Sequence, residues 1–126
     1  MQQGLADPAW VAIAGISMGG YVVYRAAVVE PRIRAAEAIL GSPEWPRGDS
    51  PHRYPEALAG TALLSITAER DENVPPAAAR ALHRMLGTAF PAAEQRYLEL
   101  PGEPHLMSAG AWATTMDEML SWLQEH

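Results

Sequence analysis

A serine stands between two glycines in the segment Gly15-Ile16-Ser17-Met18-Gly19, directly after the apolar run from Trp10 to Ala14. In the pattern G-x-S-x-G, a serine at a strand-to-helix junction occupies a sharp, strained turn that holds its hydroxyl out above the sheet. The hydroxyl becomes a nucleophile only when a base accepts its proton and a carboxylate orients that base. The motif alone leaves open a serine that merely occupies a turn.

Two further residues can complete this chemistry. Asp71 lies in the polar turn after the apolar segment 61–67, and His105 ends the turn Pro-Gly-Glu-Pro-His after the alternating segment 95–100. If both segments are strands of a parallel sheet, their carboxyl ends meet at one edge, where Ser17 also lies. We therefore expect Ser17, Asp71 and His105 to converge. Three other carboxylates are alternative orienting groups for the imidazole: Glu69, Glu72 and Glu103.

Hydrophobic patterning predicts the elements that position these residues. Strands are expected at 10–14, 35–40, 61–67 and 95–100, with the first buried on both faces. Helices are expected at 18–29, from Val74-Pro75-Pro76 to a cap at Gly87, and at 109–124. This order predicts an α/β fold: one domain, residues 1–126, with a parallel sheet of about four strands and flanking helices. The last helix is expected to bury a face made of Trp112, Met116, Met119, Leu120 and Leu123.

A segment rich in proline and glycine, residues 41–58, is expected to form a loop or small cap beside Ser17. Ile16, Met18 and residues 42–54 are expected to surround a small apolar cleft, which favours short acyl groups. Trp45 either lines this acyl pocket or buttresses the loop. The other large aromatic residues and histidines carry no expected function: Trp10 and Trp112 are core candidates, His52 and His83 are solvated or locally bonded, and His126 has no assigned part.

Composition excludes several function classes. Fifteen acidic against nine basic residues give a net charge of −6 without a basic cluster, so nucleic acid is not an expected partner. The absence of cysteine removes disulfides and thiolate chemistry, and the four histidines lack metal-site spacing, so no metal or other cofactor is expected. The apolar stretch 9–24 is interrupted by glycine and serine and fits neither a membrane span nor a signal peptide. A cytoplasmic location is the default expectation.

Three segments in register resemble the α/β-hydrolase family, in particular its small bacterial esterases and dienelactone-hydrolase-like members. They are VAIAGISMGGY around Ser17, D-x-x-V-P from Asp71 to Pro75, and PGEPH ending at His105; the segment AILGSPEW is also similar. The resemblance implies a serine esterase with Ser17 as nucleophile, His105 as general base and Asp71 as the acid that orients it. It also implies that the Met18 N–H contributes to an oxyanion hole. A peptidase or an acyltransferase shares this triad.

The resemblance covers only the family's second half, from the strand before the serine onward. Members carry about four further strands before this point, and a loop among them supplies a second oxyanion-hole N–H. Without them the strand 10–14 becomes an apolar edge strand, which invites pairing with another chain. We therefore expect a homodimer or a partner chain at this edge, unless the sequence is part of a longer protein. The alternative function is a weak or silent hydrolase module that self-associates or completes another subunit.

Overall fold

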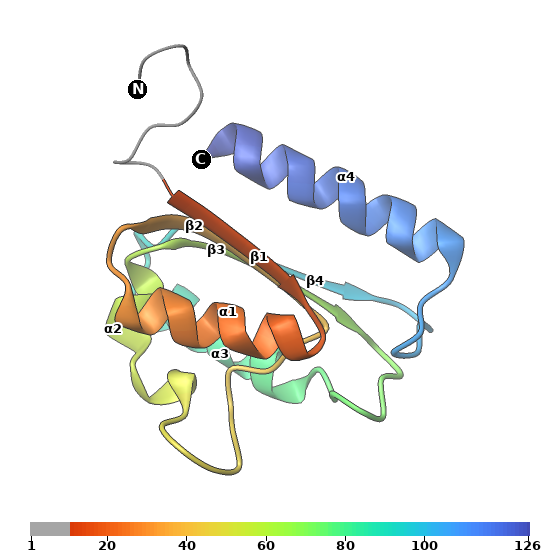
Figure 1. The fold of residues 1–126 in the computed structure, drawn as a ribbon, viewed down its shortest axis with the longest axis horizontal. Helices are drawn as coiled ribbons and strands as arrows, with labels where there is room; N and C mark the ends of the chain where they lie inside the picture. The colour runs from red at the N-terminus through yellow and green to blue at the C-terminus, as the bar shows by residue number, and fades with distance from the viewer. Residues whose placement is uncertain (1–10) are drawn as a thin grey trace.

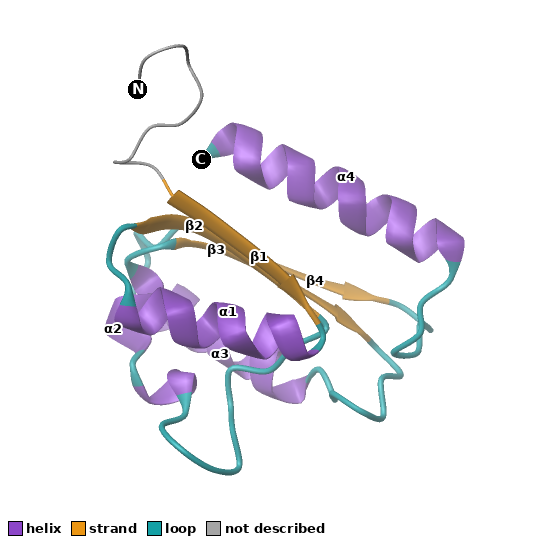
Figure 2. Ribbon diagram, viewed as in Figure 1, coloured by secondary structure: helices purple, strands orange, loops and turns teal. Residues whose placement is uncertain are grey.

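The structure, a computed structural model, describes residues 11–126. Its elements in chain order are β1 (Val11–Ile16), α1 (Met18–Val29), β2 (Ile33–Ile39), the 3-10 turn η2 (Pro51–Arg53), α2 (Pro55–Ala59), β3 (Ala62–Ala68), α3 (Ala77–Ala89), β4 (Gln95–Leu100) and α4 (Ala109–Glu125). Figure 2 shows these helices and strands by type. The predicted alternation of strands and helices is confirmed, and the segment 41–58 contains η2 and most of α2.

The four strands form one parallel sheet in the order β1-β2-β3-β4. The predicted α/β fold class is thereby confirmed. Because each strand is added on the same side of the previous one, the connecting helices α1, α2 and α3 lie on one face of the sheet. The final helix α4 covers the opposite face (Figure 1). All carboxyl ends of the strands consequently meet at one edge.

Two apolar clusters hold the helices on the sheet. On the α1 and α3 side, Val23, Leu63 and Leu86 are fully buried. On the α4 side, Ile66 belongs to the cluster that contains Trp122, whose Nε1 donates to the carbonyl of Ala62 at 3.0 Å. Burying one such side chain contributes roughly 1.5–3 kcal/mol. The central strands β2 and β3 therefore form the rigid base from which the loops at the carboxyl edge project.

The strand β1 differs from its neighbours in exposure. Val11 is 38% exposed and Ile16 is 44% exposed, whereas every residue of β3 is buried. The expectation that this strand is buried on both faces is wrong, because none of its described residues is buried. Within residues 11–126, β1 is also an edge strand with β2 as its one neighbour. The strand also continues through Gly15 to Ile16, beyond the predicted end at Ala14. Trp10, the predicted first residue, lies outside the described residues.

One helix end and one strand start correct the sequence expectations. Gly87 does not cap α3: the helix continues to Ala89, and the N–H of Phe90 donates to the carbonyl of Leu86 at 2.8 Å. A Cβ at Gly87 would come within 3.2 Å of the Gln95 side chain, which gives this glycine a packing reason inside the helix. In addition, β2 begins at Ile33, two residues before the predicted start.

The buried face of α4 also differs from the expected one. Met116 and Leu120 are 43% and 61% exposed, so they do not belong to the core. The residues that face the sheet are Ala111, Thr115 and Trp122. The hydrogen bond from Trp122 to β3 fixes the rotation of the helix, which apolar periodicity alone left ambiguous. Trp112, Met119 and Leu123 of the expected face do pack against the core.

Candidate active site

Ser17 lies in a strained turn between β1 and α1. Its backbone has φ 58° and ψ −115°, outside the region that residues with a side chain favour. The N–H of Ser17 donates to the carbonyl of Ile39 at 2.7 Å, which ties the turn to the end of β2. At that same end of β2, Leu40 has φ 55°. Strained backbone is thus found at the carboxyl ends of two adjacent strands.

The glycines around Ser17 differ in whether packing leaves room for a side chain. A Cβ on Gly15 would lie 2.3 Å from the carbonyl oxygen of Gly19, so only glycine fits there. A Cβ on Gly19 would meet nothing within 4 Å, so the second glycine of the motif is not required by packing. Packing also requires glycine at Gly20 and Gly41, which the sequence patterns did not indicate. Their backbones are in contact: a Cβ on Gly41 would be 2.5 Å from the carbonyl carbon of Gly20. Only the fold brings these two together.

The structure brings the three expected residues into one hydrogen-bonded chain. Ser17 Oγ lies 2.9 Å from His105 Nε2, and His105 Nδ1 lies 2.6 Å from Asp71 Oδ2. An ionised carboxylate only accepts hydrogen bonds, so Nδ1 carries the proton and donates to Asp71. Nε2 is then the acceptor for the Ser17 hydroxyl. These residues are 88 and 34 positions apart in sequence, and only the parallel sheet unites them.

The turn after β3 immobilises Asp71. Its Oδ1 accepts hydrogen bonds from the N–H groups of Asn73 at 2.9 Å and Val74 at 2.8 Å, and the residue is 4% exposed. One carboxylate oxygen is therefore committed to the turn while the other is aimed at His105. This arrangement explains the pattern D-x-x-V, because Val74 supplies one of the N–H groups that the aspartate binds.

The alternative carboxylates have other partners or positions. Glu69 accepts from the N–H of Gly102 at 2.7 Å, and Glu103 accepts from the N–H of Ser108 at 2.8 Å. The Glu69 bond, with that from the N–H of Arg70 to the carbonyl of Glu103 at 2.9 Å, joins the loop after β3 to the loop after β4, whereas the Glu103 carboxylate bonds within the loop after β4. The Glu69 side chain thus holds the loops of Asp71 and His105 together, and the Glu103 side chain orders the loop of His105. Among Asp71 and the three alternatives, Asp71 is the carboxylate that contacts the imidazole.

Two adjoining pockets open beside Ser17. The Ser17 pocket, of about 450 Å3, is lined by Ser17, Met18, Tyr21, Val22 and Trp45 and is mostly apolar. The Glu44 pocket, of about 400 Å3, is lined by Glu44, Ser42 and the start of α3, and it shares Tyr21 and Trp45 with the first. Both volumes lie in the range of small-molecule sites.

Of the two expected substrate-binding residues, Trp45 and Ile16, only Trp45 lines these pockets. Trp45 lines both of them, and its Nε1 donates to the carbonyl of Ser42 at 3.2 Å. Ile16 is exposed at the end of β1 and lines neither. Tyr21, which sequence reasoning missed, stands between the pockets; burial first, and then the charge of Asp71, raise its pKa above 10. Its position one helical turn after Ser17 could have indicated that Tyr21 lies beside the serine.

Met18 begins α1, where backbone N–H groups have no partner within the helix. The Met18 N–H is one of these groups and is the candidate oxyanion donor. The Met18 side chain is 80% exposed and lines the Ser17 pocket. A second donor is not identified among residues 11–126.

A second serine–histidine pair lies in the core. Ser65 Oγ is 2.6 Å from His83 Nε2 and 2.6 Å from the Tyr24 hydroxyl, and His83 Nδ1 is 2.7 Å from Gln95 Oε1. The expectation that His83 is solvated or locally bonded is wrong, because it is 6% exposed and its partners are on β3 and β4. Burial lowers the His83 pKa to about 4. His52, in contrast, bonds locally to Ser50.

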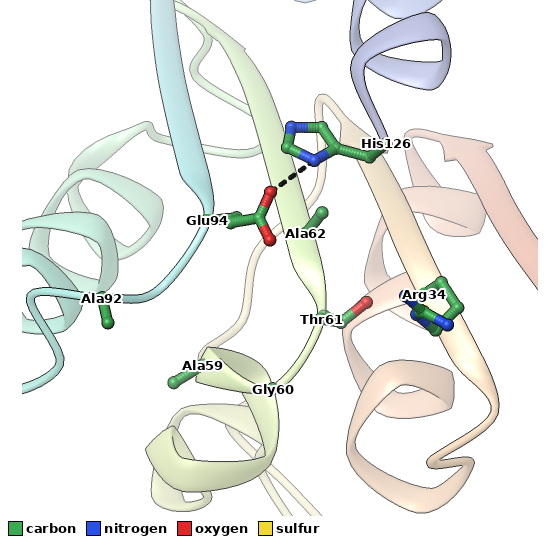
Figure 3. Close-up of a pocket in the computed structure, with 8 residues that line it drawn as sticks. All are labelled: Arg34, Ala59, Gly60, Thr61, Ala62, Ala92, Glu94 and His126. Carbon is green, nitrogen blue, oxygen red and sulfur yellow. Dashed lines mark ion pairs between the residues drawn. The ribbon is translucent and has the colours of Figure 1, made fainter.

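The opposite end of the sheet carries a separate pocket of about 230 Å3 (Figure 3). It lies at the amino ends of β2, β3 and β4, where His126 Nδ1 is 2.6 Å from Glu94 Oε2. His126, expected to have no part, thus ties the end of α4 to the start of β4. Residues 11–126 contain no cluster of three metal-ligating side chains and no helix that is long and apolar enough to cross a membrane.

Solved structures share this architecture. A puromycin-hydrolysing peptidase of Mycobacterium tuberculosis superimposes on 94% of the chain with a TM-score of 0.79 and 24% identity. A thermostable esterase covers 94% with a TM-score of 0.74 and 28% identity, and a dienelactone hydrolase from Klebsiella pneumoniae covers 91% with a TM-score of 0.77 and 18% identity. No protein-family model and no curated protein matches.

The chain spans only part of these structures: 22% of the peptidase, 31% of the esterase and 52% of the dienelactone hydrolase. Within that part the strands and helices correspond over nearly the whole chain. The chain therefore has the α/β-hydrolase fold from the strand before the serine onward, as the sequence resemblance implied.

Proposed function

We propose that this protein is a serine hydrolase that cleaves short-chain carboxylic esters. The observation that carries the proposal is the hydrogen-bonded chain from Ser17 through His105 to Asp71, with distances of 2.9 Å and 2.6 Å. The strained turn that projects Ser17 and the apolar pocket beside it support the same conclusion. The fold is shared with hydrolases and esterases, which agrees with the proposed reaction class.

In the proposed reaction, Ser17 Oγ attacks the ester carbonyl while His105 Nε2 accepts its proton. Asp71 stabilises the imidazolium that forms, and His105 then donates the proton to the departing alcohol. A water molecule activated by the same imidazole hydrolyses the acyl-enzyme. The Met18 N–H stabilises the oxyanion; loss of one such donor typically costs about 100- to 1,000-fold in rate.

The acyl group is proposed to occupy the Ser17 pocket. This pocket is wide but shallow, because Trp45 is the one residue of the segment 41–58 that lines it. Such a site favours acyl groups of a few carbon atoms over long chains. Met18 and Trp45, which line this pocket, are the proposed contacts.

A fluorophosphonate probe tests the proposal, because it reacts only with an activated serine. We expect labelling of the wild-type protein, no labelling of Ser17→Ala, and retention of labelling in Ser121→Ala, an exposed serine on α4 that lines neither pocket. Failure of the folded wild-type protein to react would contradict the proposal.

A second candidate function is a weak or silent module that self-associates or completes another subunit. The exposed β1, with Val11 and Ile16 at 38% and 44% exposure, favours it. An apolar strand without charges or proline lacks the usual protection against edge-to-edge pairing. A folded protein that fails to react with the probe but elutes as a dimer would support this candidate over the esterase.

A further inference from the structure

The two pockets beside Ser17 contain a single charged side chain between them. Among the described residues that line either pocket, Glu44 is the one that carries a charge, and neither lysine nor arginine is present. The chain as a whole has a net charge of −6. A cationic group therefore meets no positively charged side chain in these walls, whereas an anionic group would be repelled by the Glu44 carboxylate.

The Glu44 pocket also has two aromatic walls. Trp45 and Tyr21 line it together with Glu44, and the indole is anchored through its Nε1 to Ser42. Aromatic rings attract cations through their negative faces, with about 0.5–2 kcal/mol for each favourable contact. One carboxylate beside two aromatic side chains is a set that selects an ammonium group over an uncharged group of the same shape.

The backbone that carries Glu44 is held by its own hydrogen bonds. Ser42 Oγ donates to the carbonyl of Glu44 at 3.1 Å and accepts from its N–H at 3.1 Å. The N–H of Trp45 donates to Ser50 Oγ at 2.7 Å. The carboxylate and the indole therefore project from a fixed turn, so little ordering is needed when a ligand binds.

We infer that the Glu44 pocket binds a cationic group and that the preferred substrates are short-chain esters whose alcohol part carries an ammonium group. This inference rests on the proposed function. The acyl part occupies the Ser17 pocket and the ammonium group lies among Glu44, Trp45 and Tyr21. After attack by Ser17 the bond to the alcohol oxygen breaks, the alcohol leaves with the proton from His105, and water releases the acid.

Two esters of identical shape test the specificity. Butyrate esterified with 2-(trimethylammonio)ethanol carries the charge, and 3,3-dimethylbutyl butyrate replaces the nitrogen with carbon. We expect kcat/KM of the wild-type protein to be roughly 5- to 30-fold higher for the charged ester, as one or two favourable cation contacts predict. Glu44→Gln should lower this ratio at least threefold. The control Glu56→Gln removes an exposed carboxylate that lines neither pocket and should leave the ratio unchanged.

A binding measurement separates this inference from the proposed function. Phenyltrimethylammonium is titrated by calorimetry into Ser17→Ala, which cannot turn over an ester, and into the double variants with Glu44→Gln and Trp45→Ala. Binding by Ser17→Ala that weakens in both double variants supports the cation site even if no ester is cleaved. Absence of binding, or equal kcat/KM for the two esters in an active enzyme, would overturn the inference and leave the esterase proposal standing.

Discussion

The carboxyl edge of the sheet and the core beneath α3 each contain a serine hydrogen-bonded to a histidine. The distances are nearly alike: Ser17 to His105 is 2.9 Å and Ser65 to His83 is 2.6 Å, with Nδ1 of each imidazole 2.6–2.7 Å from an oxygen. The oxygen belongs to the carboxylate of Asp71 in the first pair and to the amide of Gln95 in the second. Hydrogen-bond geometry alone therefore does not distinguish the two.

Charge and access separate the pairs. An imidazole that accepts a proton becomes positive, and Asp71 stabilises that charge whereas Gln95 offers only a dipole. Burial lowers the pKa of His83 to about 4, so it remains neutral near pH 7. The His105 side chain is 17% exposed and Ser17 lines a pocket, while Ser65 is fully buried. This difference supports the proposed catalytic role of Ser17 and His105 and a structural role for Ser65 and His83.

We call Ser17 and His105 the edge pair and Ser65 and His83 the core pair. The largest expected effect comes from replacing the carboxylate beside His105 with an amide like that of Gln95 beside His83. In Asp71→Asn, the side-chain oxygen can still accept from the N–H groups of Asn73 and Val74, so the turn is retained. The amide nitrogen then faces His105 and favours the wrong tautomer, with an expected loss of roughly 1,000- to 10,000-fold in kcat. Ester hydrolysis measures kcat, and denaturant unfolding measures whether the folded structure is retained. An active variant, or one that fails to fold, would contradict the assignment.

The converse change removes the hydroxyl of the core pair. Ser65→Ala leaves the Tyr24 hydroxyl and His83 Nε2 buried without this partner, and we expect a loss of about 2–4 kcal/mol in the free energy of unfolding. Labelling of Ser17 by a fluorophosphonate should persist in the folded fraction. Thr88→Ala, which removes an exposed helix hydroxyl, is the matched control, with an expected change below about 0.5 kcal/mol. A loss of labelling without destabilisation would reverse the assignment of Ser65.

The pH dependence of stability should reveal two opposing buried groups. The folded-state pKa of His83, about 4, lies below the unfolded value of 6.5, so its contribution to stability is lost as pH falls from 6.5 to 4. Glu37 is fully buried, its carboxylate oxygens have no hydrogen-bond partner among residues 11–126, and burial raises its pKa from 4.5 to about 7. Its contribution is therefore lost as pH rises from 4.5 to 7.

Single variants separate these contributions, each about 1–3 kcal/mol. Relative to wild type, Glu37→Gln should gain stability more steeply between pH 4.5 and 6.5, because the opposing carboxyl group is gone. His83→Gln should lose stability over the same interval. Urea unfolding at several pH values provides the free energies. Parallel profiles for the three proteins would show that neither group titrates differently in the folded and unfolded states.

The sequence predicted the edge pair better than the core pair for a physical reason. Ser17, Asp71 and His105 each follow a predicted strand, and a parallel sheet brings strand ends together whatever the side-chain packing. Ser65 and His83 lie inside apolar segments, where no local signal marks a polar partner across the core. The same reason explains the contact of Gly20 with Gly41 and the rotation of α4, because both depend on packing between elements distant in sequence.

The strand before Ser17 and the strand that contains Ser65 differ in whether both of their edges are paired. Ser17 follows β1, whose outer edge has no neighbouring strand within residues 11–126, whereas Ser65 lies on a strand paired on both sides. We expect β1 to pair with the β1 of a second copy, and Val11→Lys to weaken this dimer by roughly fivefold, about 1 kcal/mol, since a charge on an edge strand disfavours pairing. Sedimentation at several concentrations measures the association. Thr114→Lys, which adds the same charge at an exposed position on α4, is the control and should leave association unchanged. A wild-type protein that remains monomeric at tens of micromolar would contradict the pairing, and the open edge of β1 would then need a different partner to protect it.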